Sequence, residues 1–367
     1  MLAFVLTLVL LLVVVIVLAY AERKVAAFMQ DRLGPTEAGP YGSLQPALDV
    51  LKLLQKEDIV PAAADKKLFK LAPILIFAAV FAGFAVIPFT PNLVPAGIGI
   101  GVFYLLAIIS LDVIGLLMAG WGSNNKYAML GAMRSVAQIV SYEIPAGLAI
   151  LSAVMVCQSL DLQEISYQQG ALMNQFPGME FDMNWLFGIR ELGINTTTIG
   201  GITTWNIFRA PILLVAFIIY FIASLAESNR APFDIPEAES ELVAGFHVEY
   251  SGFRFAVLFL AEYSMMVLVS LVAVVLFLGS WNTPFPNLGP VALAYWTSGT
   301  VGEVSGILWG AFWLLSKTFV LLFVQLQLRW TYPRMRVDQL MHLCWKVLTP
   351  VALGVVLIAG IWRLLMI

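Results

Sequence analysis

Eight long apolar stretches constrain the fold of this 367-residue chain more than any other feature of its sequence. An apolar run of about 20 residues is long enough to cross the hydrocarbon core of a bilayer as an α-helix. The sequence is 60% hydrophobic and 12% charged, whereas a soluble domain has about 25% charged residues. We therefore predict an all-α integral membrane protein. The predicted spans lie near residues 2–20, 71–90, 97–120, 136–157, 207–226, 254–279, 304–328 and 347–366.

The basic residues predict the orientation of this membrane protein, which we treat as one domain over residues 1–367. Most of the lysines and arginines fall in segment 21–70 and in the later loops that share its side of the membrane. The positive-inside rule places those loops in the cytoplasm and both termini on the other side. The loop 227–253 is then cytoplasmic, and the long polar loop 158–206 is periplasmic and contains short surface helices.

Composition limits the chemistry that the chain can carry. Its two cysteines and two histidines lack the paired spacing of iron–sulfur, zinc or haem ligands, so we predict no metal site. Cys157 and Cys344 fit small packing residues. The net charge of −3 and the lack of a basic tract argue against a nucleic-acid partner. Any electron transfer must therefore occur on a bound organic cofactor or in a partner chain.

The loop between the predicted spans 207–226 and 254–279 is unusually acidic. Its carboxylates include Glu227, Asp234, Glu237, Glu239 and Glu241, with Arg230 as the base among them. Carboxylates that lie close together and partly out of water have raised pKa values, because desolvation and like charge both disfavour ionisation. The loop predicts proton handling at a membrane, and a solvated acidic loop is the alternative.

Ionisable residues within the spans are functional candidates, because each costs about 2.5–3.5 kcal/mol at the helix centre on insertion scales. They are Asp112, Glu143, Glu262 and Lys317. Pro145 follows Glu143 and can bend the helix toward a hydrated interior, which favours a function for Glu143. The alternative is a set of buried ion pairs, for instance Lys317 with a carboxylate of another span. For Asp112 the two interpretations are equally good.

Segment 21–70 contains a predicted amphipathic helix. Leucines recur at helical spacing from Leu44 to Leu54, with polar residues between them, as in helices that lie at a membrane interface. The polar turn Gln30–Pro35 precedes it. Together they could form a doorway for a ligand that travels within the bilayer, and a simple surface anchor is the alternative.

Several ordered motifs extend over nearly the whole chain. They are Glu22-Arg-Lys24, Gln30-Asp-Arg-Leu-Gly-Pro35, Gly120-Trp-Gly-Ser-Asn-Asn-Lys-Tyr-Ala128, Ser141-Tyr-Glu143, Ala226-Glu-Ser-Asn-Arg-Ala-Pro-Phe-Asp234, Glu239-Ser-Glu-Leu242, Glu249-Tyr250, Arg329 and Tyr332-Pro-Arg-Met-Arg-Val-Asp-Gln-Leu-Met341. With these motifs the chain resembles the quinone-site membrane subunit of respiratory complex I, the H-type subunit of NADH:quinone oxidoreductase. Asp112 matches no motif of this family.

The resemblance implies two groups of functional residues. A quinone entrance and chamber wall, reached through segment 21–70, would include Gln30, Arg32, Asp49, Phe233, Asp234, Phe259 and Arg329. A proton path from the chamber into the membrane would include Glu143, Glu227, Glu237, Glu239, Glu241 and Glu249, tuned by Arg134 and Arg230.

The resemblance also implies the assembly in which the chain works. Quinone would be the substrate, and flavin and iron–sulfur clusters would be held only by partner subunits. The partners would be peripheral-arm subunits with the terminal cluster and the quinone-head site, small membrane subunits, antiporter-like subunits, and lipid. The enzyme would be a translocase that couples quinone reduction to proton translocation in the bacterial cytoplasmic membrane, or in the mitochondrial inner membrane.

Three alternatives stay open. The membrane subunit of an energy-converting hydrogenase would share the acidic path but lack a quinone chamber, and the entrance segment Gln30–Gln55 favours the quinone version. A free-standing proton-coupled transporter is less favoured because no internal repeat is visible. A purely structural anchor predicts that loss of the acids affects only assembly.

Overall fold

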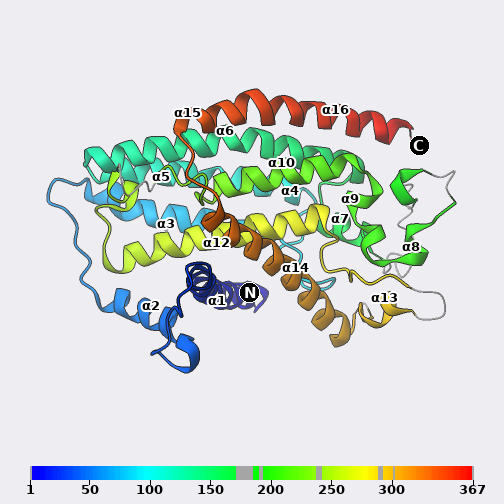
Figure 1. Ribbon diagram of the computed structural model, residues 1–367, viewed down its shortest axis with the longest axis horizontal. Coiled ribbons are helices and arrows are strands. Elements are labelled where there is room, and N and C mark those ends of the chain that lie inside the picture. The colour runs from blue at the N-terminus through cyan, green and yellow to red at the C-terminus, as the bar shows by residue number, and fades with distance from the viewer. Residues whose placement is uncertain are drawn as a thin grey trace.

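The protein is a bundle of long helices, as the computed structural model in Figure 1 shows. The structure describes residues 2–170, 185–189, 193–236, 242–287, 292–300 and 302–365. Within these ranges the extended pairings are two isolated bridges, Thr90 with Leu93 and Trp185 with Asn195. A helix satisfies its backbone polar groups within its own segment, as a lipid environment requires. The predicted all-α membrane fold is confirmed.

Six helical segments in the described part of the chain have the length and hydropathy of membrane spans. They are α3 (Lys66–Gly83) with η2 (Phe84–Val86), α4 (Gly101–Ile109) with α5 (Leu111–Gly122), α6 (Lys126–Cys157), α12 (Gly252–Phe277), α14 (Val304–Thr331), and α15 (Val337–His342) with the π-helical η8 (Leu343–Leu348) and α16 (Thr349–Leu365). Two further apolar helices are α1 (Leu2–Met29) and α10 (Ile212–Glu227). Each predicted apolar stretch therefore contains a helix, while eight crossings and the side of the termini stay predictions.

Shorter helices connect the long ones. The predicted amphipathic helix is α2 (Gln45–Gln55), and its apolar side chains, such as Leu48 and Leu51, are exposed. The other short helices are η1 (Pro40–Gly42), α7 (Leu162–Gln168), η4 (Leu186–Gly188), α8 (Thr196–Ile199), η6 (Gly201–Thr204), α9 (Asn206–Arg209), η7 (Gly245–His247) and α13 (Leu293–Trp296). Short helices thus occur in the described part of the 158–206 loop.

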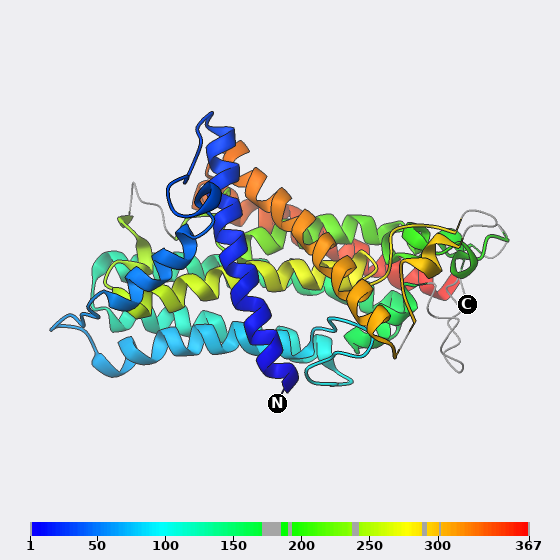
Figure 2. The same cartoon turned by 90° about the horizontal axis from the view of Figure 1, so that it is seen from below.

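Helix α12 forms the centre of the bundle, since every residue from Tyr263 to Phe277 is buried. It packs against α3, α10, α14 and α1. Figure 2 shows α1 and α14 crossing the other long helices at a steep angle and approaching each other at one end. Association of helices in lipid depends on close packing and small residues. A Cβ on Gly131 would lie 2.7 Å from Gly245 Cα, so this glycine lets η7 pack directly against α6.

Lys317 of α14 shows how the bundle accommodates a buried charge. Its Nζ donates to the carbonyl oxygens of Leu278, Ser280 and Asn282 at 2.8, 2.9 and 2.6 Å. These carbonyls follow the end of α12, where backbone acceptors lack intrahelical partners and a cation is favoured. Among the described residues, backbone carbonyls hold the amine, and the carboxylate partner suggested for Lys317 is not found.

We predict that Lys317→Met destabilises the bundle. The substitution keeps the apolar stem but leaves buried carbonyls without a donor, which costs about 1–3 kcal/mol for each one that stays unsatisfied. We expect the midpoint of thermal unfolding to fall by roughly 5 °C or more. Unfolding can be followed by the reaction of a thiol dye with Cys157 and Cys344, both buried in the folded chain.

Lys346→Met is the matched control, because Lys346 is exposed in η8. Equal midpoints for the two variants would show that the three hydrogen bonds of Lys317 do not stabilise the fold.

Candidate functional site

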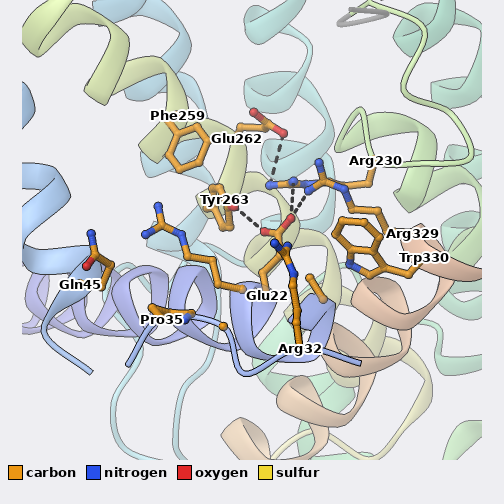
Figure 3. A pocket seen from close by; sticks show the side chains of 13 residues that line it. Glu22, Arg32, Pro35, Gln45, Arg230, Phe259, Glu262, Tyr263, Arg329 and Trp330 are labelled. Atoms are coloured by element: carbon orange, nitrogen blue, oxygen red, sulfur yellow. Dashed lines mark hydrogen bonds and ion pairs between the residues drawn. The ribbon is translucent and has the colours of Figure 1, made fainter. Parts of the chain in front are cut away.

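A cavity of about 520 Å³ opens where α1, α12 and α14 approach one another. Figure 3 shows its lining side chains, which come from five separate parts of the chain. The charged and polar ones are Glu22, Arg23, Arg32, Gln45, Arg230, Glu262, Tyr263 and Arg329. Phe259 and Trp330 add aromatic surface. The cavity therefore combines a charged interior with apolar walls.

Glu22 accepts three hydrogen bonds at the centre of this cavity. The donors are Arg230 Nη1 at 3.4 Å, Arg329 Nη1 and the Tyr263 hydroxyl. Arg230 also lies 3.3 Å from Glu262 Oε1 and 4.4 Å from the centre of the Tyr263 ring. Buried charges are tolerated when they are paired and hydrogen-bonded. The carboxylate of Glu22 meets this condition. Glu22, Arg230, Glu262, Tyr263 and Arg329 are together called the Glu22 cluster below.

Helical spacing explains how α1 and α12 present these groups. Phe259, Glu262 and Tyr263 are three and four residues apart, so they share one face of α12. Glu22 and Ala26 likewise share a face of α1 and both line the cavity. Phe259 also packs against Tyr263, with ring centres 4.6 Å apart. Two regular helices therefore place six of the thirteen lining residues.

Four of the seven predicted entrance residues line the cavity or contact its lining. Arg32, Phe259 and Arg329 line the cavity, and Asp49 of α2 pairs with the lining residue Arg23 at 2.5 Å. Gln30 is exposed just after α1.

Phe233 and Asp234 do not line this cavity. The ring of Phe233 is buried against Tyr142, 5.3 Å away between centres. Asp234 forms an ion pair with Arg334 at 2.8 Å. Both residues therefore hold the loop after α10 against its neighbours, and a role in quinone binding stays a prediction for every residue of the predicted entrance.

The predicted acidic path is described only in part, because Glu237, Glu239 and Glu241 lie outside the described residues. Glu143 is half-buried on α6, and Glu227 is buried at the end of α10. The two are close enough for their charges to interact.

The remaining predicted members of this path are Glu249, Arg134 and Arg230. Glu249 accepts a hydrogen bond from Asn125 Nδ2 at 2.6 Å. Arg134 lies on α6, and Arg230 belongs to the Glu22 cluster. Gln138 Nε2 donates to the carbonyls of Ala226 at 2.7 Å and Phe233 at 2.8 Å, which fixes the start of the acidic loop against α6.

A second, smaller cavity of about 30 Å³ lies beside the first. Its lining includes Asp112 of α5, Glu227, His247 of η7 and Glu262. Glu262 lines both cavities. A carboxylate shared in this way can respond to charge in the larger cavity and exchange protons with the smaller one.

Sequence reasoning left Glu22, Glu262 and Tyr263 out of the predicted site. Glu22 ends an apolar stretch within Glu22-Arg23-Lys24, and Glu262 is an acid inside a span, so both carried a signal. Tyr263 carried none, because a tyrosine in an apolar helix is ordinary. In the described part of the chain, no group of three or more His, Cys, Asp or Glu side chains has a metal-binding arrangement.

Comparison with known proteins identifies the family. A sequence model described as NADH dehydrogenase matches residues 2–360. The chain is 59% identical to the second of the H subunits of NADH-quinone oxidoreductase in Cytophaga hutchinsonii, over 98% of this chain and 97% of that protein. It is 52% identical to the corresponding H subunit of Chlorobium luteolum over 94% and 84% of the two chains. The H subunit of Polaromonas naphthalenivorans is 45% identical over 93% and 84%. The chain therefore belongs to the NADH dehydrogenase family that includes these H subunits of NADH-quinone oxidoreductase.

Proposed function

We propose that this chain, a membrane subunit of NADH-quinone oxidoreductase by its family, forms the quinone entrance and one wall of the quinone chamber. We further propose that its buried acids couple quinone reduction to proton translocation. The observation that carries the proposal is the position of Glu262. It is paired with Arg230 of the Glu22 cluster and borders both the large cavity and the small acidic one.

The large cavity suits an amphipathic ligand. A volume of about 520 Å³ falls within the usual range for small-molecule sites, about 300–1,000 Å³. Arginine and tyrosine donors can contact the carbonyl oxygens of a quinone as it passes through the entrance, while Phe259 and Trp330 offer apolar contact. The exposed leucines of α2 would lie at the membrane interface. The Arg23–Asp49 ion pair holds α2 beside the cavity, so a ligand in the bilayer would enter next to this helix.

The proposed chemistry divides the work between this chain and its partners. Reduction of a quinone to a quinol consumes two electrons and two protons. Peripheral-arm subunits would deliver the electrons from a flavin and iron–sulfur clusters, and would hold the quinone head. Residues of this chain would orient the quinone and hold protons. Interacting acids titrate together, so a change of charge in the large cavity would alter the proton occupancy of Glu262 and then of Glu227.

The path would continue from Glu227 toward Glu143, with Glu237, Glu239, Glu241 and Glu249 as its predicted cytoplasmic members. Neighbouring small and antiporter-like membrane subunits would convert the shift in protons into pumping. The bacterial relatives favour the cytoplasmic membrane as the location, with segments 21–70 and 227–253 facing the cytoplasm.

Purification of the tagged chain in mild detergent tests this assignment. Flavin and iron–sulfur subunits should copurify and give inhibitor-sensitive NADH:quinone reductase activity. Hydrogenase activity in the eluate would support the alternative that the chain is the membrane subunit of an energy-converting hydrogenase. A chain that purifies alone and moves protons would support the transporter alternative.

We predict that Glu22→Gln lowers quinone reductase activity in the assembled enzyme about tenfold or more, which corresponds to about 1.4 kcal/mol in the barrier. The substitution removes the charge that Arg230 and Arg329 share, so both guanidinium groups lose their alignment at the cavity. The exposed carboxylate Asp338 on α15 provides the control Asp338→Asn. Full activity of Glu22→Gln at normal enzyme content would exclude a role for the cluster in quinone reduction.

We also predict that Glu143→Gln and Glu241→Gln lower both quinone reduction and proton pumping, because glutamine cannot carry a proton between sites. Activity should be measured in sealed vesicles and normalised to the amount of assembled enzyme. Glu57→Gln, at an exposed position after α2, is the control. Normal pumping per electron in both variants would remove the proposed path, and a loss of assembly alone would support the structural anchor.

A further inference from the structure

The small cavity contains an acid to which neither the family motifs nor the predicted path assigns a role. Asp112 lies in the first turn of α5, within the apolar span Gly101–Gly122. It is buried, with only 8% of its surface exposed. Among the described residues, Oδ1 of Asp112 has no hydrogen-bond partner. A buried acceptor without a donor destabilises a fold, so this position needs a physical reason.

In the described part of the chain, the lining of this cavity contains other acids and no lysine or arginine, and Arg230 pairs with Glu262 from outside the lining. The other titratable groups that line the cavity are Glu227, Glu262 and His247, and the rest of the lining from α3, α5, α10, η7 and α12 is apolar or uncharged. Burial lowers the pKa of His247 to about 4, so its imidazole is neutral at pH 7. Asp112 and Glu227 are also close enough for their charges to interact.

The cavity has room for water. Its volume of about 30 Å³ exceeds the roughly 10–15 Å³ that one water molecule needs. A buried water also needs two to four polar partners, and the carboxyl groups of Asp112, Glu227 and Glu262 supply them. Water here can donate to the free Oδ1 of Asp112 and connect the three acids.

We propose that Asp112 is an additional proton-binding residue of the acidic path, connected through water in the small cavity to Glu262 and Glu227. The inference rests on the proposed function, because it assumes that Glu262 exchanges protons with this cavity. A carboxyl group of Glu262 gives its proton to water and becomes a carboxylate, and the water gives a proton to the carboxylate of Asp112. No electron moves in this step.

A structural role makes a different prediction. Negative side chains are favoured in the first turn of a helix, where backbone N–H groups lack partners. The chain interrupts its helix at Ser110, between α4 and α5, so Asp112 could only stabilise the new start. Asparagine keeps the size and the acceptor oxygen of the side chain and loses only the charge, whose effect at a helix start is small, but it could not bind and release a proton.

The test compares Asp112→Asn with Asp112→Glu in the assembled enzyme in sealed vesicles. We expect Asp112→Asn to lower the coupled quinone reductase rate roughly three- to tenfold, about 1 kcal/mol in the barrier, and to lower pumping with it. Asp112→Glu should restore most of the loss. In the infrared difference spectrum between oxidised and reduced enzyme, a carboxylic acid band should vanish in Asp112→Asn and shift in Asp112→Glu.

Two parallel variants separate the possible outcomes. Ser110→Ala removes a hydroxyl that donates to the Ala107 carbonyl at the helix break and should leave turnover unchanged. If Glu227→Gln lowers turnover while Asp112→Asn does not, this inference fails and the acidic path stands. If neither variant changes turnover or pumping, the path itself fails. A loss in Asp112→Asn with an unchanged infrared spectrum would show a structural role and overturn the proposal.

If Asp112→Asn does not assemble, the Asp112→Glu spectrum decides. A shifted carboxyl band supports proton binding at this position, and an unshifted band contradicts it.

Discussion

The structure of the site depends on one buried carboxylate, that of Glu22. It receives hydrogen bonds from Arg230, Tyr263 and Arg329, so it joins α1, the loop after α10, α12 and α14. Apolar packing between helices supplies little specificity in lipid, because lipid tails are as apolar as the side chains. A buried carboxylate that these three donors satisfy together favours the arrangement in which the four segments meet. Removing one member of a buried ion pair costs about 3–5 kcal/mol, since the other charge is left unpaired.

The same network links the large cavity to the small acidic cavity through the charges of Glu22, Arg230 and Glu262. Arg230 lies between Glu22 and Glu262, at 3.4 and 3.3 Å from their carboxylates. Its attraction to one carboxylate competes with its attraction to the other. A change in the charge of the cavity therefore alters the balance at Glu262, which also borders the small acidic cavity. The proposed coupling would therefore depend on short electrostatic contacts around Arg230.

Hydropathy predicted the helices well, and predicted their ends and their partners poorly. The apolar runs appear as helices because each is long enough to cross a bilayer, where the backbone polar groups must be paired within the segment. The interruption at Ser110 and the start of α10 at Ile212 depend on packing that hydropathy does not contain. For the site, too, the sequence predicted single residues better than it predicted their neighbours. Acids such as Glu143 and Glu262 stand out in apolar spans, but their neighbours come from remote segments. The role of Tyr263 becomes evident only when α12 lies beside α1, because its hydroxyl then donates to Glu22.

A comparison of Lys317 with the Glu22 cluster shows why an ionisable residue in a span need not be functional. Both bury charge, and in both the buried charge is met by polar partners. The amine of Lys317 is held by three backbone carbonyls, which have fixed positions and take up no protons near neutral pH, so its environment is constant. The guanidinium of Arg230 is held by carboxylates, whose charge changes with each proton gained or lost. The partners of a buried charge, more than its burial, therefore distinguish a structural support from a group that can transmit a signal.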